Sequence, residues 1–145
     1  MTEDPFRPPN SDVDDKAKKT PHPSAAWRVF FGFNCLLITL NILFIPLVEA
    51  VGFFEIIDFT FTNLAFVGLY GFIFLKPIGK VVFWRYFFYA AIVENFLVLV
   101  VFPLFKIPIY GQQLPFDWWY LVSVVNTFFT LVALNIYAYK IRSIW

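Results

Sequence analysis

Four long apolar runs constrain this chain more than any other feature of its sequence. They cover residues 29–48, 59–75, 86–105 and 118–139. A helix that crosses the hydrocarbon core of a bilayer needs about 20 predominantly apolar residues, within a range of about 17 to 25. No run alternates strictly between apolar and polar residues, as a transmembrane β-strand would. Since a chain in lipid must satisfy its own backbone hydrogen bonds, the runs predict four transmembrane helices.

The composition agrees with a lipid environment. The 145 residues are 60% hydrophobic and 14% charged, whereas a soluble domain is roughly half apolar and about a quarter charged. A chain of this size exposes too much surface to hide such an excess in a core. The net charge of +1 gives no electrostatic basis for binding nucleic acid. We therefore predict an all-α integral membrane protein, with its four transmembrane helices in an up-down bundle.

The first 26 residues differ from the rest of the chain. They hold five of the ten prolines, mixed charges and almost no apolar periodicity, which is typical of disordered segments. The first apolar run starts too late and is too long for the hydrophobic region of a signal peptide. We predict a disordered tail over residues 1–26 and a four-helix transmembrane domain over residues 27–145.

Basic residues indicate the orientation. Ten of the eleven Lys and Arg residues lie in the tail through Arg28, in the link 76–85, or after residue 139. With four spans, these three segments share one face, and the opposite face holds Lys106 alone. Cytoplasmic loops are enriched in Lys and Arg. The pattern predicts that the N- and C-termini are both cytoplasmic.

Tryptophans mark the ends of the runs. An indole ring prefers the headgroup level of a bilayer, and all five tryptophans lie at or beside predicted span ends. We interpret them as interfacial anchors: Trp27, Trp84, Trp118, Trp119 and Trp145. The compact size and short loops favour a bacterial inner membrane as the location.

Polar residues within the runs converge on one depth. Counted from the span ends, they lie close to the predicted midplane. The predicted cluster consists of Glu94, Asn41, Asn126, Thr127 and Thr130, with Asn95 beside Glu94. A carboxylate at this depth costs about 2.5–3.5 kcal/mol on insertion scales, and no run contains Lys, Arg or His. We expect Glu94 to be neutral and to donate a hydrogen bond to Asn41, Asn126, Thr130 or a buried water.

Small residues predict the helix contacts. Ala90 and Ala91 lie on the face of Glu94, three and four residues before it. The second run offers Ala65, Gly68 and Gly71. Because small residues let helix backbones approach closely in lipid, we interpret the two glycines as a close-packing face.

Two roles for the polar cluster remain open. An ionisable residue within a membrane is by default a candidate site for transport or ligand binding. The alternative is structural, since polar side chains also join helices, at about 0.6 kcal/mol for each hydrogen bond. Glu94 is the only acidic residue within the runs, and a single acid without a second titratable partner makes a poor proton relay. On this basis we favour the structural role.

Cysteine and histidine, which many metal, cofactor and catalytic sites require, are scarce in this chain. The chain has one cysteine, Cys35, and one histidine, His22, which lies in the tail. We therefore expect no metal, no cofactor and no enzyme activity. The function that we favour is a non-catalytic accessory, scaffold or protective subunit that acts through membrane partners. The alternative is a small oligomeric transporter or channel that uses Glu94. In either case the expected partners are the lipid bilayer and a membrane protein or a second copy of the chain.

Overall fold

The computed structural model describes residues 23–44, 52–107, 118–141 and 145. Of these residues 86% are helical and none is in a strand. Four helices are long and apolar enough to cross a membrane. The all-helical fold class and the presence of four such helices therefore confirm the prediction from the apolar runs.

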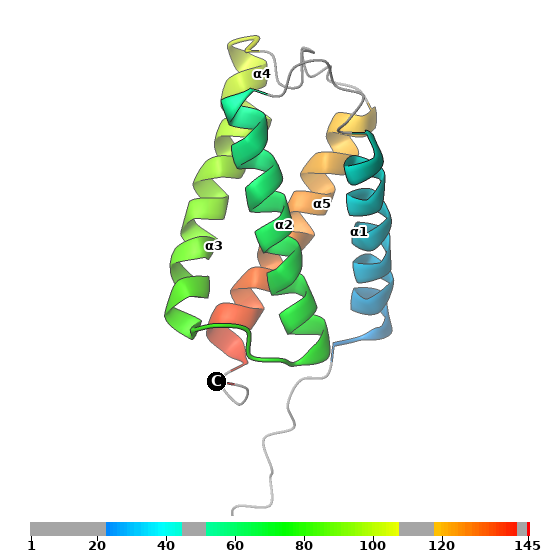
Figure 1. The fold of residues 1–145 in the computed structure, drawn as a ribbon, viewed down its shortest axis with the longest axis vertical. Coiled ribbons are helices and arrows are strands. Elements are labelled where there is room, and N and C mark those ends of the chain that lie inside the picture. Colours follow the sequence, from blue (N-terminus) through cyan, green and yellow to red (C-terminus); the bar gives the residue numbers. More distant parts are fainter. Residues whose placement is uncertain (1–22, 45–51, 108–117, 142–144) are drawn as a thin grey trace, which may run out of the picture.

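The long helices run in alternating directions (Figure 1). The first two are α1 (Ala25–Phe44) and α2 (Phe53–Phe74). The third apolar segment consists of α3 (Val81–Phe96), a π-helical turn η3 (Leu97–Val101) and the short α4 (Phe102–Leu104). The last consists of α5 (Trp118–Asn135) and a second π-helical turn, η4 (Ile136–Lys140).

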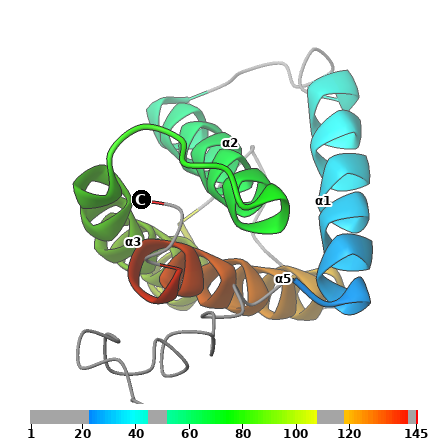
Figure 2. The same cartoon turned by 90° about the horizontal axis from the view of Figure 1, so that it is seen from below.

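Helix α5 joins the bundle together. It packs against both α2 and α3, while α1 packs mainly against α2. In the end-on view, α5 extends along one side of the bundle from α3 toward α1 (Figure 2). Only 6% of the segment Ala25–Leu43 is buried within the bundle, against 28% of Phe53–Phe74. Helix α1 is therefore the most peripheral of the four.

Three helices begin earlier than the apolar runs suggest, and one of them is α3, which begins at Val81 rather than at residue 86. Helix α1 begins at Ala25, within the predicted tail, and the part of that tail before Pro23 lies outside the described residues. Helix α2 begins at Phe53, so that Glu55 and Asp58 are helical rather than part of a connecting loop. Acidic residues near a helix N-terminus are stabilised by the helix dipole. The charges that interrupt the apolar run thus do not interrupt the helix.

The best-buried part of the core lies where the link between α2 and α3 meets η4. The Tyr137 side chain is 0% exposed, and its hydroxyl donates to the carbonyl of Lys76 at 2.7 Å and accepts from the N–H of Ile78 at 2.9 Å. The indole N–H of Trp84 donates to the carbonyl of Ile78. Two buried aromatic side chains thereby hold the link against the last turn of the bundle.

The two glycines of α2 lie at the closest helix contacts. A Cβ atom at Gly68 would meet the side chains of Leu134 and Trp84, and one at Gly71 would meet the phenol of Tyr137. Both positions are buried. The close-packing face predicted from the sequence is therefore present.

The tryptophans occupy different environments. Trp118, the first residue of α5, is 70% exposed, whereas Trp84 is only 2% exposed and cannot present its ring to lipid headgroups. Trp84 is near a span end, as predicted, but it faces inward because Gly68 leaves room for its ring. Trp27 packs edge-on against Phe72. Trp145 donates its indole N–H to the carbonyl of Tyr137 at 3.1 Å. The side chain of Trp119 is not among those that the structure describes.

Candidate functional site: a polar cavity between the helices

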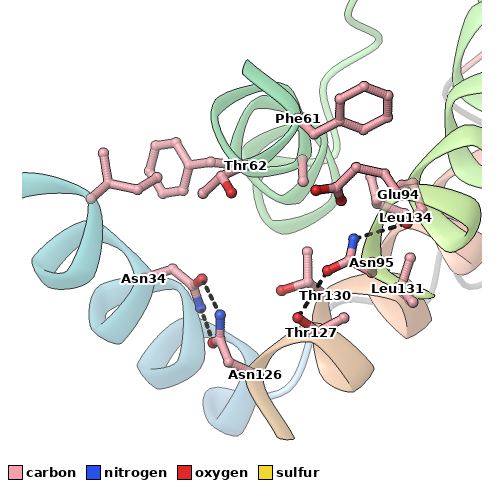
Figure 3. A pocket seen from close by; sticks show the side chains of 14 residues that line it. Asn34, Phe61, Thr62, Glu94, Asn95, Asn126, Thr127, Thr130, Leu131 and Leu134 are labelled. Atoms are coloured by element: carbon pink, nitrogen blue, oxygen red, sulfur yellow. Dashed lines mark hydrogen bonds between the residues drawn. The ribbon is translucent and has the colours of Figure 1, made fainter. Parts of the chain in front are cut away.

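A cavity of about 70 Å³ lies between α1, α2, α3 and α5. Its volume accommodates several water molecules. Seven of its fourteen lining residues are polar, and they come from all four helices (Figure 3). These are Asn34, Thr62, Glu94, Asn95, Asn126, Thr127 and Thr130. Concentrated polarity inside an otherwise apolar bundle makes this cavity the candidate site.

Each helix contributes polar residues from near its middle. Asn34 lies halfway along α1, and Thr62 occupies the same level of α2. On α5, Asn126 and Thr130 are one turn apart and therefore share a face. Since the helices have similar lengths and lie side by side, their central residues meet at one level of the bundle.

A pair of amides joins α1 to α5. The side chain of Asn34 donates to Oδ1 of Asn126 at 3.2 Å, and Asn126 donates back to Oδ1 of Asn34 at 3.3 Å. Asn34 also donates to the carbonyl of Phe30 at 2.9 Å. With 8% of its surface exposed, Asn34 is the one buried polar residue among those described. The two reciprocal bonds satisfy amide groups that would otherwise be costly to bury.

A second polar pair joins α3 to α5. The hydroxyl of Thr127 donates to Oδ1 of Asn95 at 3.1 Å. The amide of Asn95 in turn donates to the carbonyl of Ala91 at 2.8 Å, one turn earlier on α3. Ala91 itself is 2% exposed and lines the cavity. Helix α5 is therefore hydrogen-bonded through neighbouring residues, Asn126 and Thr127, to two different helices.

Glu94 on α3 is the acidic residue that lines the cavity, and Asp58 on α2 is a neighbouring acid. Of the two oxygens of Glu94, Oε1 is buried and has no hydrogen-bond partner, and the hydroxyl oxygen of Thr130 is in the same situation. Figure 3 shows the Glu94 and Thr130 side chains directed into the space between the helices. Buried oxygens without partners that line a polar cavity are places where water or a ligand binds.

The predicted cluster and the observed site overlap without being identical. Glu94, Asn126, Thr127 and Thr130 line the cavity, and Asn41 does not. Asn41 is exposed near the end of α1. Because α1 begins at Ala25 rather than at Val29, its middle falls at Asn34, about two turns before Asn41. Glu94 was expected to bond to Asn41, Asn126, Thr130 or a buried water. Oε1 of Glu94 and the hydroxyl oxygen of Thr130 have no partner within the part of the chain that the structure describes, so these two atoms are not bonded to each other.

The predicted cluster lacks Asn34 and Thr62, which both line the cavity. A usable signal for Thr62 is present in the sequence, since Asp58, Thr62 and Ala65 follow helical spacing along one face. Extending the helical pattern of the second run backward past Phe59 places these three residues on one side of α2.

The π-helical turn η3 begins three residues after Glu94. Such turns are rare and often occur at functional sites, because they widen the helix and change the direction of nearby side chains. The carbonyl of Leu99, within η3, accepts a hydrogen bond from the hydroxyl of Tyr120 at 2.6 Å. The wider turn is thus supported by α5 immediately beside the site.

The site contains no basic group. None of the lining residues is Lys, Arg or His, and the one acidic lining residue is Glu94 of α3. Across the described ranges no group of three or more His, Cys, Asp or Glu residues could hold a metal ion. The site offers instead one carboxyl group, that of Glu94, together with amide and hydroxyl oxygens. Oxygen groups of this kind suit water, a proton or a small monovalent cation better than an anion.

Comparison with known proteins adds no functional assignment. No family model, no curated protein and no solved structure matches the chain.

Proposed function

We propose that the protein is a four-span membrane protein with both ends in the cytoplasm, and that it transports a small cation through the polar cavity. Ten of eleven basic residues on one face support the orientation. We assign it to a bacterial inner membrane from its short loops and compact size. In this setting the cavity would lie near the middle of the bilayer, where substrate and coupling-ion sites of transporters lie.

The observation that carries the proposal is the polar cavity, into which Glu94 and Thr130 direct buried oxygens that have no protein partner. A carboxyl group and a hydroxyl that only joined helices would be expected to bond to one another or to a neighbouring helix. Burial of an acid without such a partner is costly. A cation-binding role supplies a reason for keeping it.

The test uses the full chain reconstituted in liposomes that enclose a pH-sensitive dye. Addition of external Na⁺ or K⁺ is expected to release protons from the lumen in wild-type liposomes. Replacement of Glu94 by Gln is expected to abolish that release, because the exchangeable carboxyl group is lost. The Glu55→Gln variant is the matched control, since the Glu55 side chain lies against Gly52 at the start of α2. Wild-type liposomes that respond to neither cation would contradict the proposal.

A second candidate is the accessory or scaffold subunit favoured by the sequence. The supporting observation is α1, with 6% of its segment buried and Asn41 exposed near its end. A polar amide on a lipid-facing surface is a strong contact point for another transmembrane helix. The partner would be a membrane protein or a second copy of this chain.

Purification from native membranes in mild detergent separates the two candidates. A scaffold is expected to retain a stoichiometric partner that Asn41→Leu releases and Glu94→Gln does not. Deletion of residues 1–26 should also weaken this partner, because the tail is the other candidate docking segment. Wild-type protein that purifies as a single chain without a partner would exclude the scaffold.

A further inference from the structure

A second hollow, which we call the apolar groove, lies between α1 and α5. Its volume is about 370 Å³, and its walls present only apolar surface. Seven of its eight lining residues are apolar, two from α1 and five from α5. The eighth, Asn126, exchanges two hydrogen bonds with Asn34 and so has its amide satisfied. The groove therefore suits an apolar ligand, unlike the polar cavity on the other side of this amide pair.

The apolar groove is about as long as one leaflet of a bilayer is deep. Its lining follows α5 from Trp118 to Phe129, which is about 16 Å of helix. The hydrocarbon core of a bilayer is about 30 Å thick, so that one leaflet supplies about 15 Å. Trp118 is the exposed first residue of α5, and an exposed indole prefers the headgroup level. The groove thus extends from the membrane surface to about its middle.

The deep end of the apolar groove is closed by aromatic rings. The ring centroids of Phe30 and Phe129 lie 5.8 Å apart, and Trp27 packs edge-on against Phe129 at 6.3 Å. These contacts join α1 to α5 below the groove. A ligand that enters from the Trp118 end would therefore stop at this level.

The width of the apolar groove decides between possible occupants. Divided by its length, the volume of about 370 Å³ corresponds to a mean cross-section of about 23 Å², that of a channel about 5 Å wide. An α-helix with its side chains is about 10–12 Å across and does not fit. Carbon atoms of packed hydrocarbon lie about 3.5–4.0 Å apart, so a single hydrocarbon chain does. The dimensions favour one acyl chain over a helix from a second copy of the protein.

The apolar groove is continuous with the surface that α1 and α5 present to lipid. Leu121 and Val125 line the groove and are exposed, and Phe128 beside them is exposed as well. Helix α1 covers little of this surface, since only 6% of its segment is buried. In Figure 1, α5 is inclined to α1. An acyl chain can therefore enter the groove sideways from the bilayer.

We propose that the apolar groove binds one acyl chain of a phospholipid from the leaflet in which α5 begins. The chain lies along α5, with its headgroup end near Trp118 and its methyl end against Phe30 and Phe129. It fills the space between α1 and α5 and so supports the most peripheral helix of the bundle. This lipid site goes beyond the proposed transport function and does not depend on it, because the polar cavity need not conduct any ion for the chain to bind.

Native mass spectrometry of the full chain tests the proposal. The protein is reconstituted with phosphatidylcholine, extracted in mild detergent and washed until loosely bound lipid is removed. The wild-type protein is expected to retain one phospholipid per chain. Val125→Trp should lose it, because the larger ring occupies the groove. Val93→Trp is the matched control, since Val93 is also an exposed valine but lies on α3 and does not line the groove; it should retain the lipid.

A competition between headgroups tests which part of the lipid is recognised. Phosphatidylcholine and phosphatidylglycerol with identical chains, mixed in equal amounts, should be retained equally, because the lining of the groove contacts only the chain. Retention of one headgroup alone would contradict an acyl-chain site. Leu121→Trp provides a second groove-filling variant at an exposed position if Val125→Trp does not fold.

Other results would also overturn the proposal. Wild-type protein that retains no lipid means that the groove has no preferred chain. Equal retention by Val125→Trp and the wild-type protein means that the lipid binds elsewhere. A lipid-free dimer that Val125→Trp dissociates would identify a second copy of the chain as the occupant. Each of these results leaves the transport experiment unaffected, so the two proposals can fail separately.

Discussion

Asn34 of α1 and Asn126 of α5 exchange two side-chain hydrogen bonds, at 3.2 and 3.3 Å. Helix α1 contacts α2 more than α5, so this amide pair is a principal connection between α1 and α5. The pair also closes one side of the polar cavity. It therefore links the stability of the peripheral helix to the integrity of the site.

Replacement of one member of this pair should destabilise the bundle more than replacement of both. Asn34→Leu leaves the partly buried amide of Asn126 without its partner, which costs up to about 1–3 kcal/mol. In the double variant, Asn34→Leu with Asn126→Leu, two apolar side chains meet and most of that loss should be recovered. Unfolding in mixed detergent micelles measures the free energy of each variant. Strictly additive effects of the two substitutions would show that the amides act independently.

The close approach of α2 and η4 predicts a strong effect at Gly71. A methyl group there would meet the phenol of Tyr137, and overpacking of this kind costs about 1–3 kcal/mol. Gly71→Ala should therefore lower the free energy of unfolding. Gly32→Ala is the matched control, because a Cβ atom at Gly32 meets nothing within 4 Å. The control should be neutral or slightly stabilising, since alanine is the better helix former. Equal effects at both glycines would contradict the packing explanation.

The difference in exposure between Trp84 and Trp118 predicts different contact with lipid. Variants that retain a single tryptophan can be reconstituted with lipids brominated near the headgroup, which quench nearby indole fluorescence. Trp118, at 70% exposure, should be quenched strongly, and Trp84, at 2% exposure, should be nearly unaffected. Similar quenching of the two would show that the core around Trp84 is open to lipid.

The proposed orientation predicts where a C-terminal reporter is active. A fluorescent protein fused after Trp145 should fluoresce in the bacterial cytoplasm, and a periplasmic phosphatase fused there should be inactive. The basic residues of the link, Lys76, Lys80 and Arg85, are on the same side. Replacement of all three by Gln should produce a mixture of orientations, because the charge bias weakens. Phosphatase activity in the unmodified fusion would reverse the proposed orientation.

The helical segments were predictable because they depend on local properties of the chain. Length and apolar composition over about 20 residues are sufficient to identify a helix able to cross a membrane, and four such helices are present. The boundaries were less predictable. The charges at Glu55 and Asp58 resemble a loop in the sequence, yet both residues are helical, and Glu55 lies in the first turn, where the helix dipole stabilises an acidic side chain.

The candidate site was predictable only in part, because its residues depend on where each helix begins. Glu94, Asn126, Thr127 and Thr130 stand out as polar residues at the middle of apolar runs, and all four line the cavity. The choice of Asn34 over Asn41 depended on where α1 begins. A shift of four residues along a helix moves the middle by about 6 Å and brings a different side chain to the level of α5.

The sequence by itself determined that this chain has four apolar helices, because hydrophobicity and length are properties of each segment alone. Only the tertiary structure decided which polar groups meet: Asn34 with Asn126, and Thr127 with Asn95. These pairings depend on the rotation and the relative height of neighbouring helices. Both are set by close contacts such as Gly68 with Trp84 and Leu134, which join residues that are distant in the sequence.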